Sequence, residues 1–300
     1  MAYRMECTMI VVTAPTSNIG SQVLERLLAE RASVRVIARD PSRLPAHTLE
    51  RVEVVAGSHS DDEVVDRAFR GADSVFWLVP PDPRALSVEA AYLDFSQAAC
   101  RAIKRHAVGH VVGVSGLGRG VAGNAGLVSA SLAMDDLIAS TGVNYRALAM
   151  PTFMDNILRH VDSIRGAGVF YSPVSGDLKL PTCATRDIAA VAAKLLMDRD
   201  WTGYDDVPVL GPEDVSFNDM AQIISEVLGK PVRFQQVAYN DFKDGLLGAG
   251  MSPAMAQGVL DMMVAKNNGL DKTQLRTPQS TTPTHFRQWC EEVLKPAVLR

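Results

Sequence analysis

Short runs of apolar residues, rich in Val and Ile, alternate with helical patterns through the first half of this chain. The runs are nearly continuous instead of alternating apolar with polar residues, which predicts strands covered on both faces. We expect strands over residues 8–13, 33–38, 51–57, 73–79, 109–116 and 143–150. We expect helices between them over residues 19–30, 61–70, 87–106 and 125–140. This alternation predicts an α/β fold with a doubly wound parallel sheet of Rossmann type.

The rhythm changes after residue 150, where Pro and Gly punctuate the stretch "SPVSGDLKLPT". The later pattern predicts helices over residues 187–198 and 216–228, strands near "DVPVLG" and "KPVRFQQV", and Met-rich helical segments over 239–267. We therefore expect two parts: a dinucleotide-binding domain over residues 1–150 and a smaller mixed C-terminal substrate lobe over 151–300. Some segments of the second part are expected to return to the core of the first.

Bulk properties exclude several classes of protein. The formal net charge is −4, without a basic stripe, so we expect no nucleic-acid partner. No apolar run reaches the roughly 18 residues of a membrane span, and "MAYRMECTMIVV" lacks a signal-peptide pattern. Cys7, Cys100, Cys183 and Cys290 are scattered without ligand spacing, which predicts reduced thiols and no metal site. We expect a cytoplasmic protein, monomeric or homodimeric, with a small-molecule substrate.

The turn in "TMIVVTAPTSNIG" has the spacing of a glycine-rich nucleotide loop, but Ala14 and Ser17 replace its first two glycines and only Gly20 remains. Ala14 suits such a bend only if its φ stays negative. The backbone N–H groups of Thr16, Ser17 and Asn18 can still face an anion, aided by the helix dipole. The alternative is a helix start that Thr16 or Ser17 caps and that binds nothing.

The end of the second expected strand bears on the choice of cofactor. In "VIARDPSRL", Ala38 stands where an acid often binds the ribose diol, and Arg39 follows, with Arg43 one turn on. A guanidinium at this place would bind a 2′-phosphate, which favours NADP(H) over NAD(H). Asp40 could instead pair with Arg39.

Several segments together resemble one family. They are "VTAPTSNIG", "VRVIARDPSRL", "ALAMPTFMDNIL", "TRDIAAVAAKLLMD" and "LGPEDVSFNDMAQIISEVLGKPVRF". Over about residues 8–240 the chain is similar to the NmrA-like, or isoflavone-reductase-like, atypical short-chain dehydrogenases. The resemblance implies a Rossmann domain that binds NADP(H) and a small substrate lobe. Known members include reductases of quinones and azo compounds, and redox-sensing regulators that bind the nucleotide without turnover.

The resemblance also implies positions for the site residues. The expected cofactor contacts are Thr13, Thr16, Ser17, Asn18, Ile19, Arg39, Leu78, Val79, Pro80, Ser115, Pro151, Thr152 and Phe153. Leu78 to Pro80, Ser115 and Pro151 to Phe153 follow or end strands and would lie near the nicotinamide. His59 stands where an adenine edge should lie, in place of the acid that often follows the third strand.

The proton donor of short-chain enzymes is missing. The expected helix "GNAGLVSASLAMDDLIAS" holds no Tyr, Lys or His, and Ser131 occupies approximately the place where related reductases carry Lys. Ser131 and Asp135 share a helix face, although exposed polar surface explains them almost as well. The candidate catalytic residues are Ser131, Tyr92 and Ser115. The candidate substrate residues are Met154, Asn156 and His160, of which Asn156 and His160 are expected on the helix after "MPTFMD".

We therefore expect an NADPH-dependent reductase of a small, aromatic or quinone-like electrophile. Two alternatives stay open. The first is a regulator that senses NADP(H) without turnover, which the missing proton donor favours. The second is a non-redox cyclase, lyase or isomerase with weakened cofactor binding, which the two lost glycines favour.

Overall fold

The computed structural model describes residues 8–121 and 123–300, and its centre is a seven-stranded parallel sheet. The strand order is β10-β6-β5-β4-β1-β2-β3. The strands are β1 (Met9–Thr13), β2 (Ser33–Ala38), β3 (Val52–Ala56), β4 (Ser74–Trp77), β5 (His110–Gly116), β6 (Asn144–Met150) and β10 (Tyr204–Pro208). The chain reverses direction across the sheet between β1 and β4, where doubly wound folds bind ligands. The predicted fold class is confirmed.

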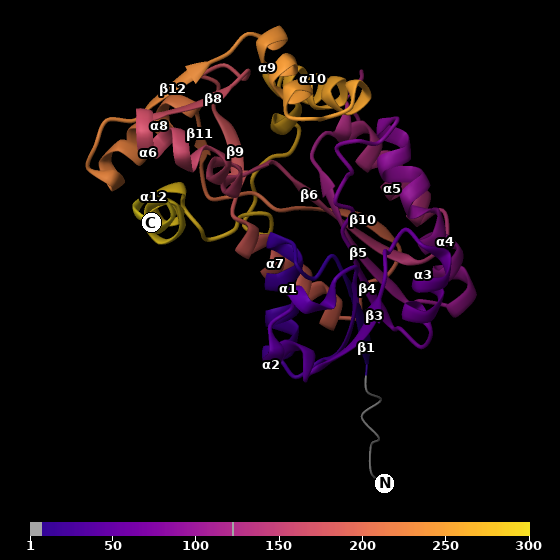
Figure 1. Cartoon of the computed structure of the whole chain (residues 1–300). Coiled ribbons are helices and arrows are strands. Elements are labelled where there is room, and N and C mark those ends of the chain that lie inside the picture. Colours follow the sequence, from indigo (N-terminus) through magenta and orange to yellow (C-terminus); the bar gives the residue numbers. More distant parts are fainter. Residues whose placement is uncertain (1–7, 122) are drawn as a thin grey trace.

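Helices cover both faces of this sheet (Figure 1). Apolar residues of α1 (Asn18–Ala29) and α7 (Thr185–Met197) pack into one core layer with the strands. Residues of α3 (Asp62–Phe69), α4 (Phe95–His106) and α5 (Leu127–Ala139) pack into the core layer on the other face. Coverage on both faces explains why the strands read as continuous apolar runs.

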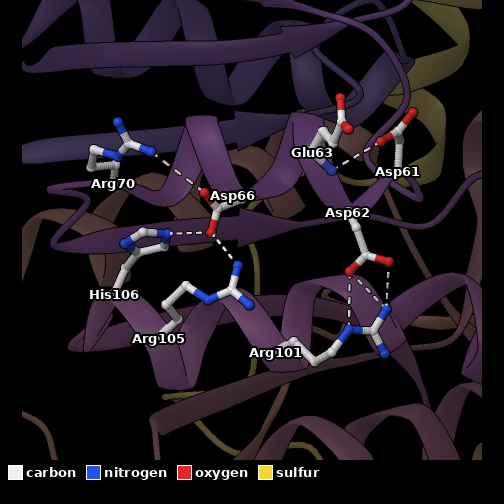
Figure 2. Close-up of polar contacts among 8 residues, drawn as sticks. All are labelled: Asp61, Asp62, Glu63, Asp66, Arg70, Arg101, Arg105 and His106. Carbon is white, nitrogen blue, oxygen red and sulfur yellow. Dashed lines mark hydrogen bonds and ion pairs between the residues drawn. The ribbon is translucent and has the colours of Figure 1, made fainter.

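The α3–α4 pair is also joined by charges on its outer surface, as Figure 2 shows. The Arg101 guanidinium donates three hydrogen bonds to Asp62, and Arg105 and His106 both contact Asp66. Asp61 is the N-cap of α3, because its carboxylate accepts a hydrogen bond from the backbone N–H of Glu63.

The C-terminal lobe has its own small core. It holds a three-stranded sheet in the order β11-β9-β7 and a parallel pair, β12 and β8. The strands are β7 (Thr152–Phe153), β8 (Val169–Ser172), β9 (Leu180–Cys183), β11 (Asp214–Val215) and β12 (Arg233–Gln236). The helices are α6 (Val161–Ala167), α8 (Phe217–Leu228), α9 (Tyr239–Gly248), α10 (Pro253–Asn267), α11 (Phe286–Trp289) and α12 (Lys295–Leu299). Since β7 follows β6 after one residue, the lobe starts at the carboxyl end of the sheet (Figure 1).

Some local expectations were wrong. The segment after "MPTFMD" was expected to start a helix, but Met154–His160 is 3₁₀-helical and α6 begins only at Val161. The expected helix over 87–106 contains a π-helical turn at Ala90–Asp94 before α4. Short elements were also missed, namely α2 (Ala46–Leu49), β7, β8, β9, β11, α11, α12, a π-helical turn at Cys290–Leu294 and 3₁₀ turns at Pro41–Arg43 and Leu270–Lys272.

The division of the chain at residue 150 stays a prediction. Residues 204–208 form the edge strand β10 beside β6, and α7 packs against α1, so these segments belong to the sheet and its covering layer. No helix in the described part of the chain is long and apolar enough to cross a membrane. Cys100, Cys183 and Cys290 are buried free thiols, whereas Cys7 lies outside the described residues.

Candidate functional site

The loop between β1 and α1 achieves its bend without the first glycine. Ala14 adopts φ +47°, so it forms the bend although the condition of a negative φ is not met. Its carbonyl accepts hydrogen bonds from the Ser17 backbone N–H (3.0 Å) and hydroxyl (2.8 Å), which hold this strained conformation. The one retained glycine is sterically required, because a Cβ on Gly20 would lie 2.2 Å from the Ala14 carbonyl oxygen.

The same loop keeps free backbone donors at the start of α1. The Ser17 hydroxyl caps α1 by accepting a hydrogen bond from the Gly20 N–H at 3.0 Å. The hydroxyl is therefore directed at the backbone of the first helical turn. Pro15 is buried, while Thr16 and Asn18 are exposed. The backbone N–H groups of Asn18 and Ile19 have no hydrogen-bond partner among the described residues, as expected in the first turn of a helix. The loop therefore caps its own helix and leaves two backbone N–H groups that could face an anion, so its role as a diphosphate site stays a prediction.

Arg39 is free to bind a phosphate. It follows β2 and is exposed, and it forms no ion pair with any residue that the structure describes. Asp40 does not engage it, because its carboxylate accepts from the backbone N–H (3.1 Å) and the hydroxyl (2.5 Å) of Ser42. The pairing of Asp40 with Arg39 is thus absent from the described structure, and the contact of Arg39 with a 2′-phosphate stays a prediction.

Thr13 and His59 form hydrogen bonds with the backbone at the end of β4. The Thr13 hydroxyl donates to the Phe76 carbonyl and accepts from the Leu78 N–H, both at 2.9 Å, and joins β1 to β4. His59 is buried, its Nε2 lies 2.9 Å from the Leu78 carbonyl oxygen, and burial lowers its pKa to about 4. His59 is therefore packed inside the protein rather than at an open adenine edge. In the segment after β4, Leu78 and Val79 are buried and Pro80 is exposed.

A buried acid, Asp135, holds Ser115 in place through a contact that the sequence did not indicate. Ser115 is the next-to-last residue of β5. Its hydroxyl donates a hydrogen bond to Asp135 Oδ2 at 2.5 Å. The Tyr145 hydroxyl donates to Asp135 Oδ1 at 2.6 Å. Asp135 is fully buried, and burial raises its pKa to about 7 against these hydrogen bonds. The alternative interpretation of Asp135 as exposed surface was wrong. Its spacing from Ser131 indicates a shared helix face, but it could not reveal hydrogen-bond partners on β5 and β6.

Arg119 extends this network toward the edge strand. Its guanidinium lies 3.5 Å from Asp135 Oδ2, donates to Asp206 Oδ2 at 2.9 Å and contacts Asp136 at 2.8 Å. It also stacks over the ring of Tyr204, 5.2 Å from the ring centre. These contacts tie the loop after β5 to α5 and β10.

Two of the predicted catalytic residues lie in constrained positions. Ser131 is buried and its hydroxyl donates to the Val128 carbonyl oxygen at 3.0 Å, within its own helix. Tyr92 lies in the π-helical turn before α4, and burial raises its pKa to about 12. No hydrogen bond to the Tyr92 hydroxyl occurs among the described residues. Their catalytic roles stay predictions.

The predicted substrate residues converge on one cavity. A cavity of about 140 Å³ lies in the C-terminal lobe and is lined by Thr152 and Phe153, directly after β6. Met154, Asn156 and His160 line it as well. Burial lowers the pKa of His160, with a smaller contribution from the neighbouring Arg159 charge. Apolar and aromatic side chains make up much of the remaining wall, which includes Ile157, Tyr171, Val174, Leu178, Leu180, Val215, Phe217, Met220, Phe242 and Met263.

The remaining predicted residues lie between the parallel sheet and the cavity of the C-terminal lobe. Pro151 is buried between β6 and β7, and Thr152 pairs with Thr182 across β7 and β9. The nucleotide loop, Ser115 and Thr152 all follow or end strands of the parallel sheet, so they lie at the same edge.

Comparison with known proteins decides the family. A sequence model described as NmrA-like family matches residues 6–286. The chain belongs to the NmrA-like family. The predicted resemblance is confirmed.

Individual relatives agree with this membership over most of their length. A (4-alkanoyl-5-oxo-2,5-dihydrofuran-3-yl)methyl phosphate reductase of Streptomyces griseus is 31% identical over 95% of this chain and 97% of its own length. An NAD(P)H azoreductase of Xenophilus azovorans is 27% identical over 85% of this chain and 86% of its own. The crystal structure of the NADPH-dependent quinone oxidoreductase of Escherichia coli complexed with NADPH superimposes with a TM-score of 0.76 at 20% identity, covering 97% and 99% of the two chains.

Proposed function

We propose that this NmrA-like chain is an NADP(H)-dependent reductase of a small, ring-containing electrophile of aromatic or quinone-like character. The observation that carries the proposal is the cavity beside Thr152 and Phe153, at the sheet edge that also holds the nucleotide loop. Hydride transfer requires the nicotinamide and the acceptor side by side, and a ligand in the cavity next to Thr152 and Phe153 would lie beside a nicotinamide bound at this edge. The reductases and oxidoreductases among the relatives support the same class of activity.

The chain's own residues would divide the work of holding the nucleotide. The N–H groups of Asn18 and Ile19 would face the diphosphate, and Arg39 would face the 2′-phosphate. Leu78, Val79 and Ser115 would form the floor under the nicotinamide, with Asp135 fixing the Ser115 hydroxyl through the 2.5 Å hydrogen bond. Bound NADPH would supply the hydride.

The cavity would supply the acceptor with an apolar, water-poor setting. The side chains of Met154, Phe217 and Met263 would pack against a flat ring, and methionines adapt well to such shapes. Because no donor projects freely from α5, the proton that completes the reduction has to come from the cavity side or from solvent.

The proposal is tested by mixing the purified protein with NADPH and a panel of quinones and azo compounds while the nicotinamide absorbance is followed. We expect loss of absorbance with at least one acceptor, and much slower loss with NADH. Arg39→Ala should remove the preference for NADPH. Replacement of the exposed Arg31, which lies outside the loop, with Ala serves as the matched control.

A second candidate function is nucleotide sensing without turnover. The Ser131 hydroxyl already donates its hydrogen bond to the Val128 carbonyl oxygen. This favours the sensing function, because α5 then offers no proton donor. NADPH that binds but is not consumed with any acceptor would support this function. Absence of nucleotide binding altogether would instead favour the non-redox alternative.

A further inference from the structure

The cavity of the C-terminal lobe has two polar groups on one side that the proposed function does not use. Thr182, on β9, lines the cavity and is 2% exposed, and its hydroxyl has no hydrogen-bond partner among the described residues. Lys266, on α10, lines the cavity as well. Its ammonium group donates to Asp271 Oδ2 at 2.5 Å, and both side chains are buried.

These groups lie where the lobe meets the carboxyl edge of the sheet. Asp271 belongs to the 3₁₀ turn Leu270–Lys272, which contacts β9. Leu270 of the same turn packs against the loop after β5, since a Cβ on Gly118 would lie 2.4 Å from Leu270 Cδ1. The turn that carries Asp271 therefore lies against both β9, which holds Thr182, and the loop that follows Ser115.

The charges around the cavity restrict the ligand that this polar side fits. No Asp or Glu occurs among the lining residues, so the wall offers donors rather than carboxylate acceptors. Lys266 is already paired with Asp271, whereas Arg159, the other cation of the lining, is exposed. An anion placed against the buried Lys266–Asp271 pair would leave a net negative charge there, which is costly. A neutral oxygen acceptor adds no charge and gives the Thr182 hydroxyl and the remaining ammonium hydrogens a partner.

We propose that Lys266 and Thr182 bind the neutral carbonyl oxygen of a ring-sized ligand, with the ring against the apolar wall. The cavity volume of about 140 Å³ is close to the roughly 150 Å³ of an engineered apolar cavity that takes up benzene, so it fits one ring. The role of this ligand as the electrophile that is reduced rests on the proposed function, whereas its binding does not.

Binding of three one-ring probes tests the site directly. Acetophenone carries a neutral carbonyl, benzoate carries an anionic carboxylate, and ethylbenzene has a similar shape without an acceptor. Each is titrated by ligand-observed NMR and calorimetry, both without nucleotide and with saturating NADP⁺. We expect acetophenone to bind more tightly than the other two under at least one of these conditions. Equal or tighter binding of benzoate, or no binding of acetophenone under either condition, would overturn the proposal.

Two variants assign the effect to these residues. Thr182→Val keeps the shape and should weaken acetophenone roughly two- to tenfold. The double variant Lys266→Met, Asp271→Leu removes both buried charges together and should weaken it roughly ten- to a hundredfold. Ethylbenzene affinity should stay within about twofold, which also reports that the cavity is intact. Thr48→Val, a buried threonine on the far helix α2, is the control.

The outcomes separate this inference from the proposed function. If acetophenone affinity depends on Lys266 and Thr182 while NADPH is never consumed, the binding site stands and the reductase proposal fails. If NADPH is consumed but both variants bind acetophenone as the unmodified protein does, the reductase proposal stands and this site is refuted.

Discussion

Replacement of Asp135 by Asn should change how the stability of this protein depends on pH. Asp135 is fully buried and accepts hydrogen bonds from Ser115 and Tyr145. Burial dominates over these contacts and raises its pKa from 3.8 to about 7. Asn has the same shape and carries no charge at any pH, but it keeps only one of the two acceptor oxygens that Ser115 and Tyr145 use. That altered hydrogen bond changes the stability by an amount that is independent of pH, whereas the lost ionisation changes its pH dependence.

The sign follows from proton linkage. Between about pH 4 and pH 7 the folded protein keeps a proton on Asp135 that the unfolded chain has lost. The stabilisation from this proton is fully present below the unfolded pKa and is lost as the pH rises through about 7. The rise from 3.8 to about 7 corresponds to on the order of 4 kcal/mol. The free energy of unfolding of Asp135→Asn minus that of the unmodified protein should therefore increase by up to about this amount from pH 4 to pH 8.

Urea denaturation at a series of pH values measures this difference, and only its change with pH is interpreted. Asp136→Asn, one residue along the same helix, is the control, because Asp136 is exposed and its contact with Arg119 lies at the surface. The control difference should vary by less than about 1 kcal/mol over the same range. A flat profile for Asp135→Asn would refute the account of a buried, protonatable acid behind Ser115.

Three further outcomes concern the nucleotide loop. Ala14→Gly should stabilise the fold by up to about 1 kcal/mol in thermal or urea unfolding, because glycine relieves the φ of +47°; a destabilised variant would contradict the strain. Gly20→Ala should destabilise by about 1–3 kcal/mol in the same assay and abolish NADPH binding, since its Cβ would meet the Ala14 carbonyl at 2.2 Å; normal binding would show that the turn adapts. Arg39→Ala should weaken NADPH roughly ten- to a hundredfold in calorimetry and leave NADH unchanged, whereas equal losses for both would mean that Arg39 does not read the 2′-phosphate.

Local patterns were sufficient to predict the parallel sheet. The strands from β1 to β6 lie within one to two residues of the expected ranges, because burial on both faces leaves a continuous apolar run that no polar face interrupts. The same reasoning failed for β7 and β11, which are two residues long and carry no period to detect. The 3₁₀ segment Met154–His160 was missed for a related reason, since a pattern of apolar and polar residues does not distinguish it from an α-helix.

The candidate site was predictable only where its residues follow strands. Arg39, Ser115 and Thr152 could be placed from the sequence, because strand ends of a parallel sheet share an edge. The role of Asp135 could not, since its partners Ser115 and Tyr145 lie 20 and 10 residues away. Thr182 and Lys266 could not either, because only the folded structure shows that both are buried and line one cavity. Ala14 shows a further limit: steric preference led us to require a negative φ for this bend, but Ala14 forms it at a positive φ, where its carbonyl accepts two hydrogen bonds from Ser17.

The central claim is that this loop binds a dinucleotide phosphate although two of its three glycines are gone. Calorimetric titration of the purified protein with NADPH, and separately with NADH, tests it most directly. The account predicts saturable binding of NADPH at a single site and weaker binding of NADH. No measurable heat or competition from either nucleotide, with the protein shown to be folded, would contradict it.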